Sequence, residues 1–401
     1  MTRTAHPRPP RLALAGLFAA CATAASAQDF NAAPPNSPDQ RPAFAGQTRA
    51  PIIADSVALA TEVVVDGLEH PWGMAELPGG GILVTERPGR MRLVGPGGTL
   101  SAPIDGLPEV DARGQGGLLD VAVKDDFSAT RRVWWSYAEP RGGGRNGTAV
   151  ATGLLSPDGR TMEDVAVIFR QQPAWASTRH FGSRLVFDDA GALFVTTGER
   201  SLPEPRQLAQ DVATHLGKVL RIAPDGGPAE GNPTIPGGLP EIWSYGHRNL
   251  QAATLGPDGA LWTVEHGPRG GDELNRPEPG RNYGWPVITY GEDYSGRPIG
   301  AGITAHPGME QPVYYWDPVI APSGMVFYDG PLFADWRGSL LVGGLSGSLV
   351  RLVLDGGRVT GEARYLEGIG RVRDVAVASD GAVMILTDAD NGALVRVTPA
   401  R

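Results

Sequence analysis

The sequence predicts an all-β protein, a six-bladed β-propeller, and three observations favour this fold class. Glycine and proline are abundant, with 56 and 36 of the 401 residues, as expected of a chain with many turns. A hydrophobic content of 41% and nine tryptophans indicate a packed interior. After about residue 57, short alternating or β-branched runs that end in glycine or proline turns recur along the chain.

The recurring unit is a glycine turn followed by an apolar strand. Its five clearest copies are residues 80–86, 191–197, 259–265, 338–344 and 381–387. The first gap has room for a sixth unit, whose strands are expected at 132–137 and 148–154. Residues 57–65 are a candidate strand to complete the last blade, and ring closure would remove exposed sheet edges. A seventh blade or a pair of β-sandwiches is the alternative architecture.

The first 27 residues have the order of a secretory signal peptide. Three arginines precede an apolar stretch, residues 12–25, which leads to a small-residue cleavage site that ends at Ala27. We therefore predict a signal peptide over 1–27 and a periplasmic or secreted mature protein. A short core helix and lipoprotein anchoring through Cys21, the only cysteine, are the alternatives.

Composition predicts the organisation of the remaining chain. Residues 28–55 are rich in Ala, Pro, Asn and Gln and are expected to form a disordered linker, followed by the propeller domain over 56–401. The formal net charge of −9 argues against nucleic acid as a partner. After residue 30 no uninterrupted apolar run reaches the roughly 18 residues of a membrane helix, so no membrane span is expected.

Candidate functional residues are sought in loops, because a propeller gathers its loops at the ends of a central channel. His180 stands beside small residues at the entrance of a strand, where it could take a proton near neutrality or serve as a structural hydrogen-bonding residue. Glu199 follows the next strand and would fix the tautomer of His180 if it faced that ring, whereas a simple turn carboxylate is the alternative. Gln115 lies in a glycine turn and could bind a ligand or the turn itself.

Two further loops carry cationic side chains. Arg248 and Asn249 place a forked cation beside an amide, a pairing suited to carboxylate or quinone oxygens, although a solvated arginine is an equal alternative. Arg371 and Arg373 open a late strand, and the two-residue period aims both at one face. Like charges so close favour an anion between them, or else an exposed strand face.

The loop over residues 265–275 combines glycines with acidic residues. Its exposed carbonyl oxygens and carboxylates suit calcium, which prefers oxygen ligands, although such a loop can also be a plain turn. The sequence has no paired His/Cys spacing for zinc, no nucleotide-binding glycine fingerprint and no Gly-x-Ser-x-Gly elbow of a serine hydrolase.

Together these loops resemble the soluble pyrroloquinoline-quinone-dependent sugar dehydrogenases, the glucose/sorbosone dehydrogenase family, and specifically its aldose sugar dehydrogenase branch. The resemblance extends over nearly the whole body, about residues 68–388. The motifs that carry it are Gly-Gln-Gly-Gly-Leu-Leu (114–119), His-Phe-Gly-Ser-Arg-Leu (180–185), Gly-His-Arg-Asn (246–249), Glu-His-Gly-Pro (265–268), Asn-Tyr-Gly-Trp-Pro (282–286) and Arg-Val-Arg-Asp (371–374). It implies a six-bladed propeller that oxidises aldoses at C1 to lactones with pyrroloquinoline quinone (PQQ) and calcium, and passes electrons to an external acceptor.

The resemblance also implies roles for matched residues. His180 matches the general base and Glu199 its acidic partner. Arg248 and Asn249 match residues that face the quinone C5 oxygen and the substrate side. Gln115 matches an amide beside cofactor and sugar.

The remaining matches concern the cofactor carboxylates and calcium. Arg371 and Arg373 match the pair that holds the carboxylates of the cofactor. The carbonyl oxygens of Gly267 and Pro268 match the protein ligands of the cofactor-bridging calcium. A second, structural calcium site is implied by Glu273, the Tyr283 carbonyl and Asp293.

Two departures from the glucose dehydrogenase branch limit what is carried over. The loop over 344–347 lacks the lysine of that branch, and Arg179 replaces an acid that precedes its base, so the sugar preference is not transferred. A calcium-dependent lactonase or esterase propeller and a non-catalytic propeller that binds a glycan or protein are the competing functions. Both a monomer and a homodimer are compatible with the sequence.

Overall fold

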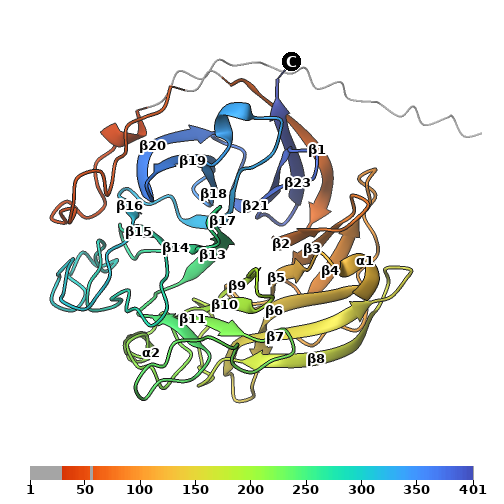
Figure 1. Cartoon of the computed structure of the whole chain (residues 1–401), viewed down its shortest axis with the longest axis horizontal. Helices are drawn as coiled ribbons and strands as arrows, with labels where there is room; N and C mark the ends of the chain where they lie inside the picture. Colours follow the sequence, from red (N-terminus) through yellow and green to blue (C-terminus); the bar gives the residue numbers. More distant parts are fainter. Residues whose placement is uncertain (1–28, 55–56, 401) are drawn as a thin grey trace, which may run out of the picture.

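The computed structural model describes residues 29–54 and 57–400, so the predicted signal peptide lies outside the described residues. The described strands form six sheets arranged in a ring, as Figure 1 shows, which confirms the six-bladed propeller.

The first sheet has three strands, β2 (Pro71–Glu76), β3 (Ile82–Glu86) and β4 (Arg90–Val94). The second contains β5 (Leu118–Val123), β6 (Arg132–Pro140), β7 (Asn146–Leu155) and β8 (Met162–Arg170). The third contains β9 (Gly182–Phe187), β10 (Leu193–Thr197), β11 (Lys218–Ile222) and β12 (Ile242–Tyr245). The fourth contains β13 (Leu250–Leu255), β14 (Leu261–Glu265), β15 (Asp272–Asn275) and β16 (Tyr314–Trp316).

The fifth sheet contains β17 (Pro322–Phe327), β18 (Leu340–Gly344), β19 (Ser348–Asp355) and β20 (Arg358–Tyr365). The sixth contains β21 (Val372–Val377), β22 (Val383–Thr387), β23 (Gly392–Pro399) and β1 (Leu59–Leu68). The helices are short: α1 (Phe127–Thr130), α2 (Pro203–Gln207) and 3₁₀ turns at Phe30–Ala32 and Ala334–Trp336. None of the helices in the described part of the chain has the length and apolarity needed to cross a membrane.

The hydrophobic core lies between neighbouring blades. In one cluster Trp134 and Val150 of the second blade pack against Leu185 and Leu193 of the third. A strand covered by a sheet on both faces can be apolar at consecutive positions, which explains why β10 is buried along its whole length. The apolar runs after each glycine turn are therefore blade strands.

The ring is closed by its first and last strands. β1 pairs antiparallel with β23, with Thr61 opposite Val397 and Val63 opposite Val395. This confirms the expectation that residues 57–65 complete the last blade. As the outermost strand of the sixth sheet, β1 covers the edge of β23 that would otherwise be unpaired.

Residues 29–53, which we call the N-terminal arm, differ from the expected disordered linker. Gln47 and Ala50 of the arm are fully buried. The backbone N–H of Tyr315 in β16 donates to the Gln47 carbonyl oxygen at 2.8 Å, and the N–H of Ile53 donates to Glu362 of β20 at 2.9 Å. Figure 1 shows the arm, in red and orange, along the outside of these two blades. Composition misled the prediction because the arm is held largely by hydrogen bonds to other parts of the chain.

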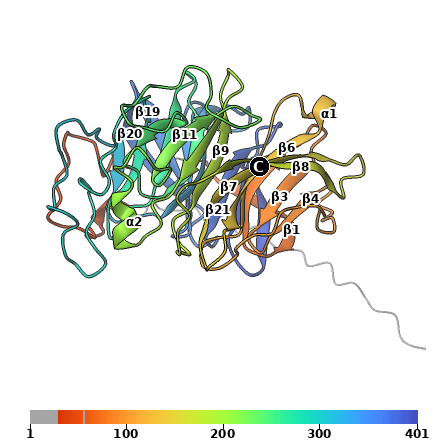
Figure 2. The same ribbon diagram turned by 90° about the horizontal axis from the view of Figure 1, so that it is seen from below.

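The site is positioned by the alternating direction of the strands. Loops that enter the first strand of each blade share one end of the ring with loops that join the second and third strands. α2 belongs to this end, since it joins β10 to β11, whereas α1 joins β5 to β6 at the other end. Figure 2 shows the two helices on opposite faces of the ring. All predicted motif loops lie at the end that carries α2.

Candidate active site

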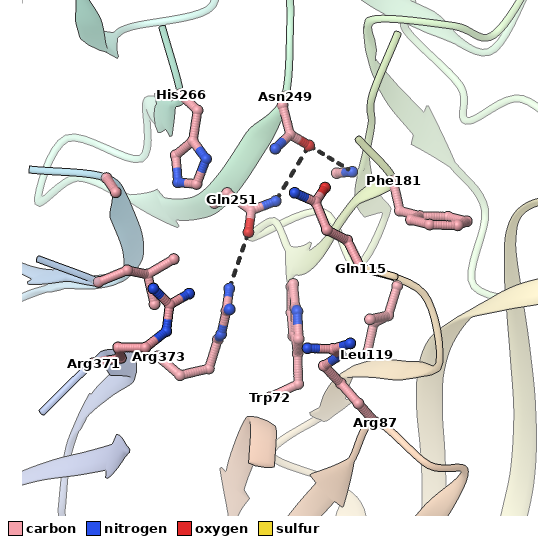
Figure 3. A pocket seen from close by; sticks show the side chains of 13 residues that line it. Trp72, Arg87, Gln115, Leu119, Phe181, Asn249, Gln251, His266, Arg371 and Arg373 are labelled. Carbon is pink, nitrogen blue, oxygen red and sulfur yellow. Dashed lines mark hydrogen bonds between the residues drawn. The ribbon is translucent and has the colours of Figure 1, made fainter. Parts of the chain in front are cut away.

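A cavity of about 220 Å³ lies at this end of the ring. All six blades, or the loops next to them, contribute to its lining, so residues distant in sequence converge there (Figure 3). The lining residues are Trp72, Arg87, Gln115, Leu119, Phe181, Gly182, Asn249, Gln251, His266, Ala321, Leu345, Arg371 and Arg373.

A buried acid–base pair lies beside this cavity. Nδ1 of His180 contacts Oε1 of Glu199, and both residues are buried. The side-chain oxygen of Gln115 accepts a 2.8 Å hydrogen bond from the backbone N–H of His180. His180 has a positive φ of 52°, and a Cβ at Gly198 would lie only 2.1 Å from the His180 carbonyl oxygen, so the turn requires glycine there.

The surroundings of this pair control its protons. Burial, together with the positive charge of Arg248, lowers the pKa of His180 well below its usual value. Burial raises the pKa of Glu199 to about 7. When Glu199 is ionised, the contact holds the imidazole proton on Nδ1 and leaves Nε2 as a proton acceptor. The pair can therefore act as a base.

Arg248 is tied to the same pair through the backbone. The N–H of Glu199 donates to the Arg248 carbonyl oxygen at 2.9 Å. The Arg248 guanidinium donates to the carbonyl oxygen of His266 at 2.9 Å and lies 5.2 Å from the Trp285 ring. Its buried Nε has no hydrogen-bond partner among the described residues. The structure thus brings His180 and Arg248 together and leaves a buried donor that an anionic oxygen could satisfy.

Asn249 begins a chain of amides along the cavity wall. Its side-chain oxygen accepts hydrogen bonds from Gly182 N–H at 3.2 Å and from the side chain of Gln251 at 3.3 Å. The Gln251 side-chain oxygen in turn accepts from Arg373 at 3.1 Å, as Figure 3 shows. No motif indicated Gln251, which lies in β13 two residues after Asn249.

One side of the cavity is cationic. Arg373 is buried and paired with Asp388 at 2.5 Å, whereas the Arg371 side chain is 55% exposed and lies 3.6 Å from the same carboxylate. Arg87, which no motif indicated, donates to the Gly116 carbonyl oxygen and completes the group. Figure 3 shows these guanidinium groups opposite His266 and Asn249. Three cations with one shared carboxylate favour a ligand that carries anionic groups.

Arg200, which no sequence motif indicated, holds the loop that carries His180. It is fully buried and donates to the carbonyl oxygens of His180 at 3.1 Å and Ser177 at 2.7 Å, and to the Asn146 side chain. Its guanidinium lies 3.7 Å from the Phe181 ring centroid. Burial lowers the pKa of Arg200 to about 9. No carboxylate pairs with it among the described residues, and such a costly group is expected to serve function.

The loop after β14 presents two backbone carbonyls. The N–H of Gly267 donates to Oδ1 of Asp272 at 2.9 Å, and Oδ2 of Asp272 accepts from the N–H groups of Ile320 and Ala321. The carbonyl oxygens of Gly267 and Pro268 accept no hydrogen bond from the described residues. Unsatisfied carbonyl oxygens of this kind fit a hard cation such as calcium.

The residues that the resemblance implies for a second calcium site each contact a different partner. Glu273 accepts a 3.1 Å hydrogen bond from Asn275, the Tyr283 ring stacks on His247, and Asp293 accepts from Ser295 in its own turn. Burial and the nearby Glu265 raise the pKa of Glu273 well above its usual value. In residues 29–54 and 57–400, no three Asp, Glu, His or Cys side chains group as a metal site.

Comparison with known proteins identifies a family that this chain matches. Residues 68–396 match the family model described as Glucose / Sorbosone dehydrogenase. The chain is 45% identical over 347 residues to the aldose sugar dehydrogenase YliI of Escherichia coli K12, a match that covers 84% of this chain and 92% of the relative.

Solved structures agree with the sequence comparison. The soluble aldose sugar dehydrogenase of Escherichia coli in its apo-form has a TM-score of 0.82 at 44% identity, over 86% of this chain and 100% of that one. The PQQ-bound form of the aldose sugar dehydrogenase from Streptomyces coelicolor has a TM-score of 0.71 at 29% identity, with the same coverages of 86% and 100%. With the fold, the cavity and these matches in agreement, the chain belongs to the glucose/sorbosone dehydrogenase family of oxidoreductases.

Proposed function

We propose that this protein oxidises aldose sugars at C1 to lactones, with PQQ and calcium as cofactors and an external electron acceptor. The observation that carries the proposal is the cavity itself: arginines and amides line it, and Gln115 of the lining accepts from the backbone N–H of His180, whose buried pair with Glu199 lies beside the cavity. The predicted export signal over residues 1–27 supports a periplasmic or secreted enzyme whose catalytic domain is 56–401.

The cavity fits a quinone that carries several carboxylates. Arg87, Arg371 and Arg373 line the cavity and can bind carboxylates. Arg248, held by the His266 carbonyl oxygen, has a buried Nε without a partner among the described residues, which suits a quinone oxygen. The PQQ-bound relative from Streptomyces coelicolor supports the same cofactor here. When bound, the quinone supplies a two-electron acceptor for the hydride that leaves C1 of the sugar.

The loop after β14 fits calcium. The carbonyl oxygens of Gly267 and Pro268 are free of donors from the described residues, and the N–H of Gly267 donates to the Asp272 carboxylate. Hard oxygen ligands of this kind suit calcium, which would bind between this loop and the cofactor. For the second site implied by Glu273, Tyr283 and Asp293, the described contacts offer no comparable support.

The chain's own residues handle the proton. Nε2 of His180 takes the proton of the C1 hydroxyl, because the Glu199 contact keeps the other ring proton on Nδ1. The imidazolium that forms is stabilised by the adjacent Glu199 carboxylate. The Arg248 guanidinium stabilises the negative charge that develops on the quinone oxygen. Asn249 and Gln115 orient the bound sugar and cofactor.

Reconstitution tests the proposal. We expect apoprotein supplied with PQQ and calcium to reduce an electron-accepting dye when aldoses are added, and to lose this activity when either cofactor is omitted. A calcium-dependent lactonase would instead cleave esters without PQQ, and a non-catalytic propeller would take up no PQQ. Either of these results would contradict the proposed function.

A further inference from the structure

We propose that the N-terminal arm is a clasp that holds the loop carrying Gly267 and Pro268, and thereby increases the affinity of this chain for calcium. This inference rests on the proposed function, because that function assigns these two carbonyl oxygens to the metal. The arm lies outside residues 68–396, the part of the chain that the family model matches. The arm therefore supports the loop that carries Gly267 and Pro268 from outside the region that the family model matches.

The arm reaches the site end of the ring through Asp317. The backbone N–H groups of Asn36 and Ser37 donate to the two carboxylate oxygens of Asp317 at 2.5 and 3.1 Å. In return, the N–H of Val319 donates to the Asn36 side-chain oxygen at 2.9 Å. This reciprocal pairing docks the arm against the segment that leads into β17.

From this docking point, Ser37 contacts the proposed metal loop directly. Its hydroxyl donates a 2.6 Å hydrogen bond to the carbonyl oxygen of Arg269, the residue after Pro268. On the other side of the loop, Arg269 exchanges two backbone hydrogen bonds of 2.9 Å with Glu292. A Cβ at Gly270 would lie 2.7 Å from Oγ of Ser37, so the arm and the loop are in close contact. The loop is thus held between the arm and the segment that carries Glu292.

The same segment also supports the beginning of the loop. The Asp272 carboxylate accepts from Gly267 N–H on the loop and from the N–H groups of Ile320 and Ala321, which follow the arm's docking point at Asp317. Contacts from the arm and from Asp272 therefore converge on one short stretch of chain. They fix the loop at both ends of the carbonyl pair.

The rest of the arm is anchored independently of the metal loop. Arg49 donates to the carbonyl oxygens of Ala33 and Asp317, both at 2.9 Å. Gln47 donates to the Pro312 carbonyl oxygen at 3.0 Å and accepts from the Tyr290 hydroxyl at the same distance. An arm fixed along its length can transmit its own rigidity to the loop.

Rigidity of this loop matters because a metal site with preset ligands loses less entropy when it binds its ion. Groups that orient metal ligands without touching the metal typically change metal affinity by about 10- to 100-fold. Ser37 acts one residue away from Pro268, so a smaller effect of about three- to tenfold is expected for its hydroxyl alone.

The test uses the mature full chain, with Ser37→Ala as the main variant. Its matched control is Asn31→Ala, which removes a 2.8 Å hydrogen bond to Ala50 inside the arm and leaves the loop contacts intact. The measured quantity is the calcium concentration that gives half-maximal uptake of PQQ, read from PQQ absorbance on the protein. We expect Ser37→Ala to raise it about three- to tenfold and Asn31→Ala to leave it unchanged.

A second measurement needs neither PQQ nor calcium. Hydrogen exchange at the amides of residues 267–271 in the apoprotein should be faster in Ser37→Ala than in the wild type and in Asn31→Ala. Either an unchanged calcium dependence or an unchanged exchange rate in Ser37→Ala would overturn the clasp. If the wild type binds PQQ with calcium and the variant does so equally well, only the clasp fails. If the wild type takes up no PQQ at any calcium concentration, the proposed function fails and the clasp with it.

Discussion

The guanidinium of Arg200 donates a 3.1 Å hydrogen bond to the backbone carbonyl oxygen of His180. This buried cation therefore fixes the loop that carries His180, the proposed base. Its positive charge also lowers the pKa of His180. Burial lowers the pKa of His180 most, followed by Arg248 and then Arg200. Arg200 is thus a positioning residue whose effect can be separated into a geometric and an electrostatic part.

Substitution of Arg200 should alter the pH dependence of the enzyme. Arg200 lowers the pKa of Glu199 as well as that of His180, so in Arg200→Met the pKa of Glu199 should rise and the acid limb of kcat/KM should move to higher pH by about 0.5–1 unit. Arg200→Lys keeps the charge and should therefore keep the wild-type acid limb of kcat/KM. Its kcat should still fall, because the guanidinium hydrogen bond to the Ser177 carbonyl oxygen is lost. Identical acid limbs in the methionine and lysine variants would show that only packing matters at this position.

Glu199 should set the acid limit of the wild-type enzyme. Because its folded-state pKa is raised to about 7, the carboxyl is protonated below that pH and no longer holds the His180 proton on Nδ1. The value of kcat/KM should therefore rise with pH through about 7. In Glu199→Gln this limb should disappear, with a loss of roughly 10- to 100-fold in kcat, measured with saturating PQQ and calcium. A limb near 7 that survives in Glu199→Gln would contradict this assignment.

The proton acceptor itself is tested by His180→Gln. Turnover should fall by about two to four orders of magnitude, because the amide cannot take the proton of the C1 hydroxyl. PQQ uptake should change little, since His180 is not among the residues that line the cavity. Steady-state dye reduction and PQQ absorbance measure the two effects separately. Unchanged turnover would remove His180 from its proposed role.

Replacing each of the two arginines of the 371–374 motif with alanine should affect a different property: PQQ binding for Arg371 and the stability of the fold for Arg373. Arg371 is largely exposed, so Arg371→Ala should leave the free energy of unfolding within about 0.5 kcal/mol of wild type. The same change should weaken PQQ binding by about tenfold through the lost charge-assisted contact.

Arg373→Ala should instead destabilise the fold, because it removes the 2.5 Å partner of the buried Asp388. Arg373 contributes to holding the pKa of Asp388 low, so its loss leaves a buried charge less compensated and costs roughly 1–3 kcal/mol. Thermal or urea unfolding of the apoproteins distinguishes the pair. Equal stability in the two alanine variants would contradict the structural role of Arg373.

Much of the architecture could be predicted because it depends on local patterns. A glycine turn and an apolar strand are visible within seven residues, and β10 and β14 appear where this pattern predicts them. The strand that closes the ring was also recognised, as the pairing of β1 with β23 confirms. The arm was not, since its order depends on contacts such as Ser37 with Arg269, which are 232 positions apart in the chain.

The site was predicted where residues fall into motifs and missed where they do not. His180 and Glu199 meet as the motifs implied. Arg87, Arg200 and Gln251 carry no local signal that distinguishes a buried contact from a solvated side chain. Their partners are backbone carbonyls and side chains that only the tertiary fold brings near, such as Arg373 for Gln251.

The ring of blades is complete only when β1 pairs with β23. These two strands flank all the others in sequence, so five blades can assemble while the sixth still lacks one strand. Contacts between such distant segments form slowly, so we expect the meeting of the two ends to be a late step of folding. Until then an unpaired edge of the unfinished sheet stays open to association with other chains, so the period before closure is when this protein is most exposed to aggregation.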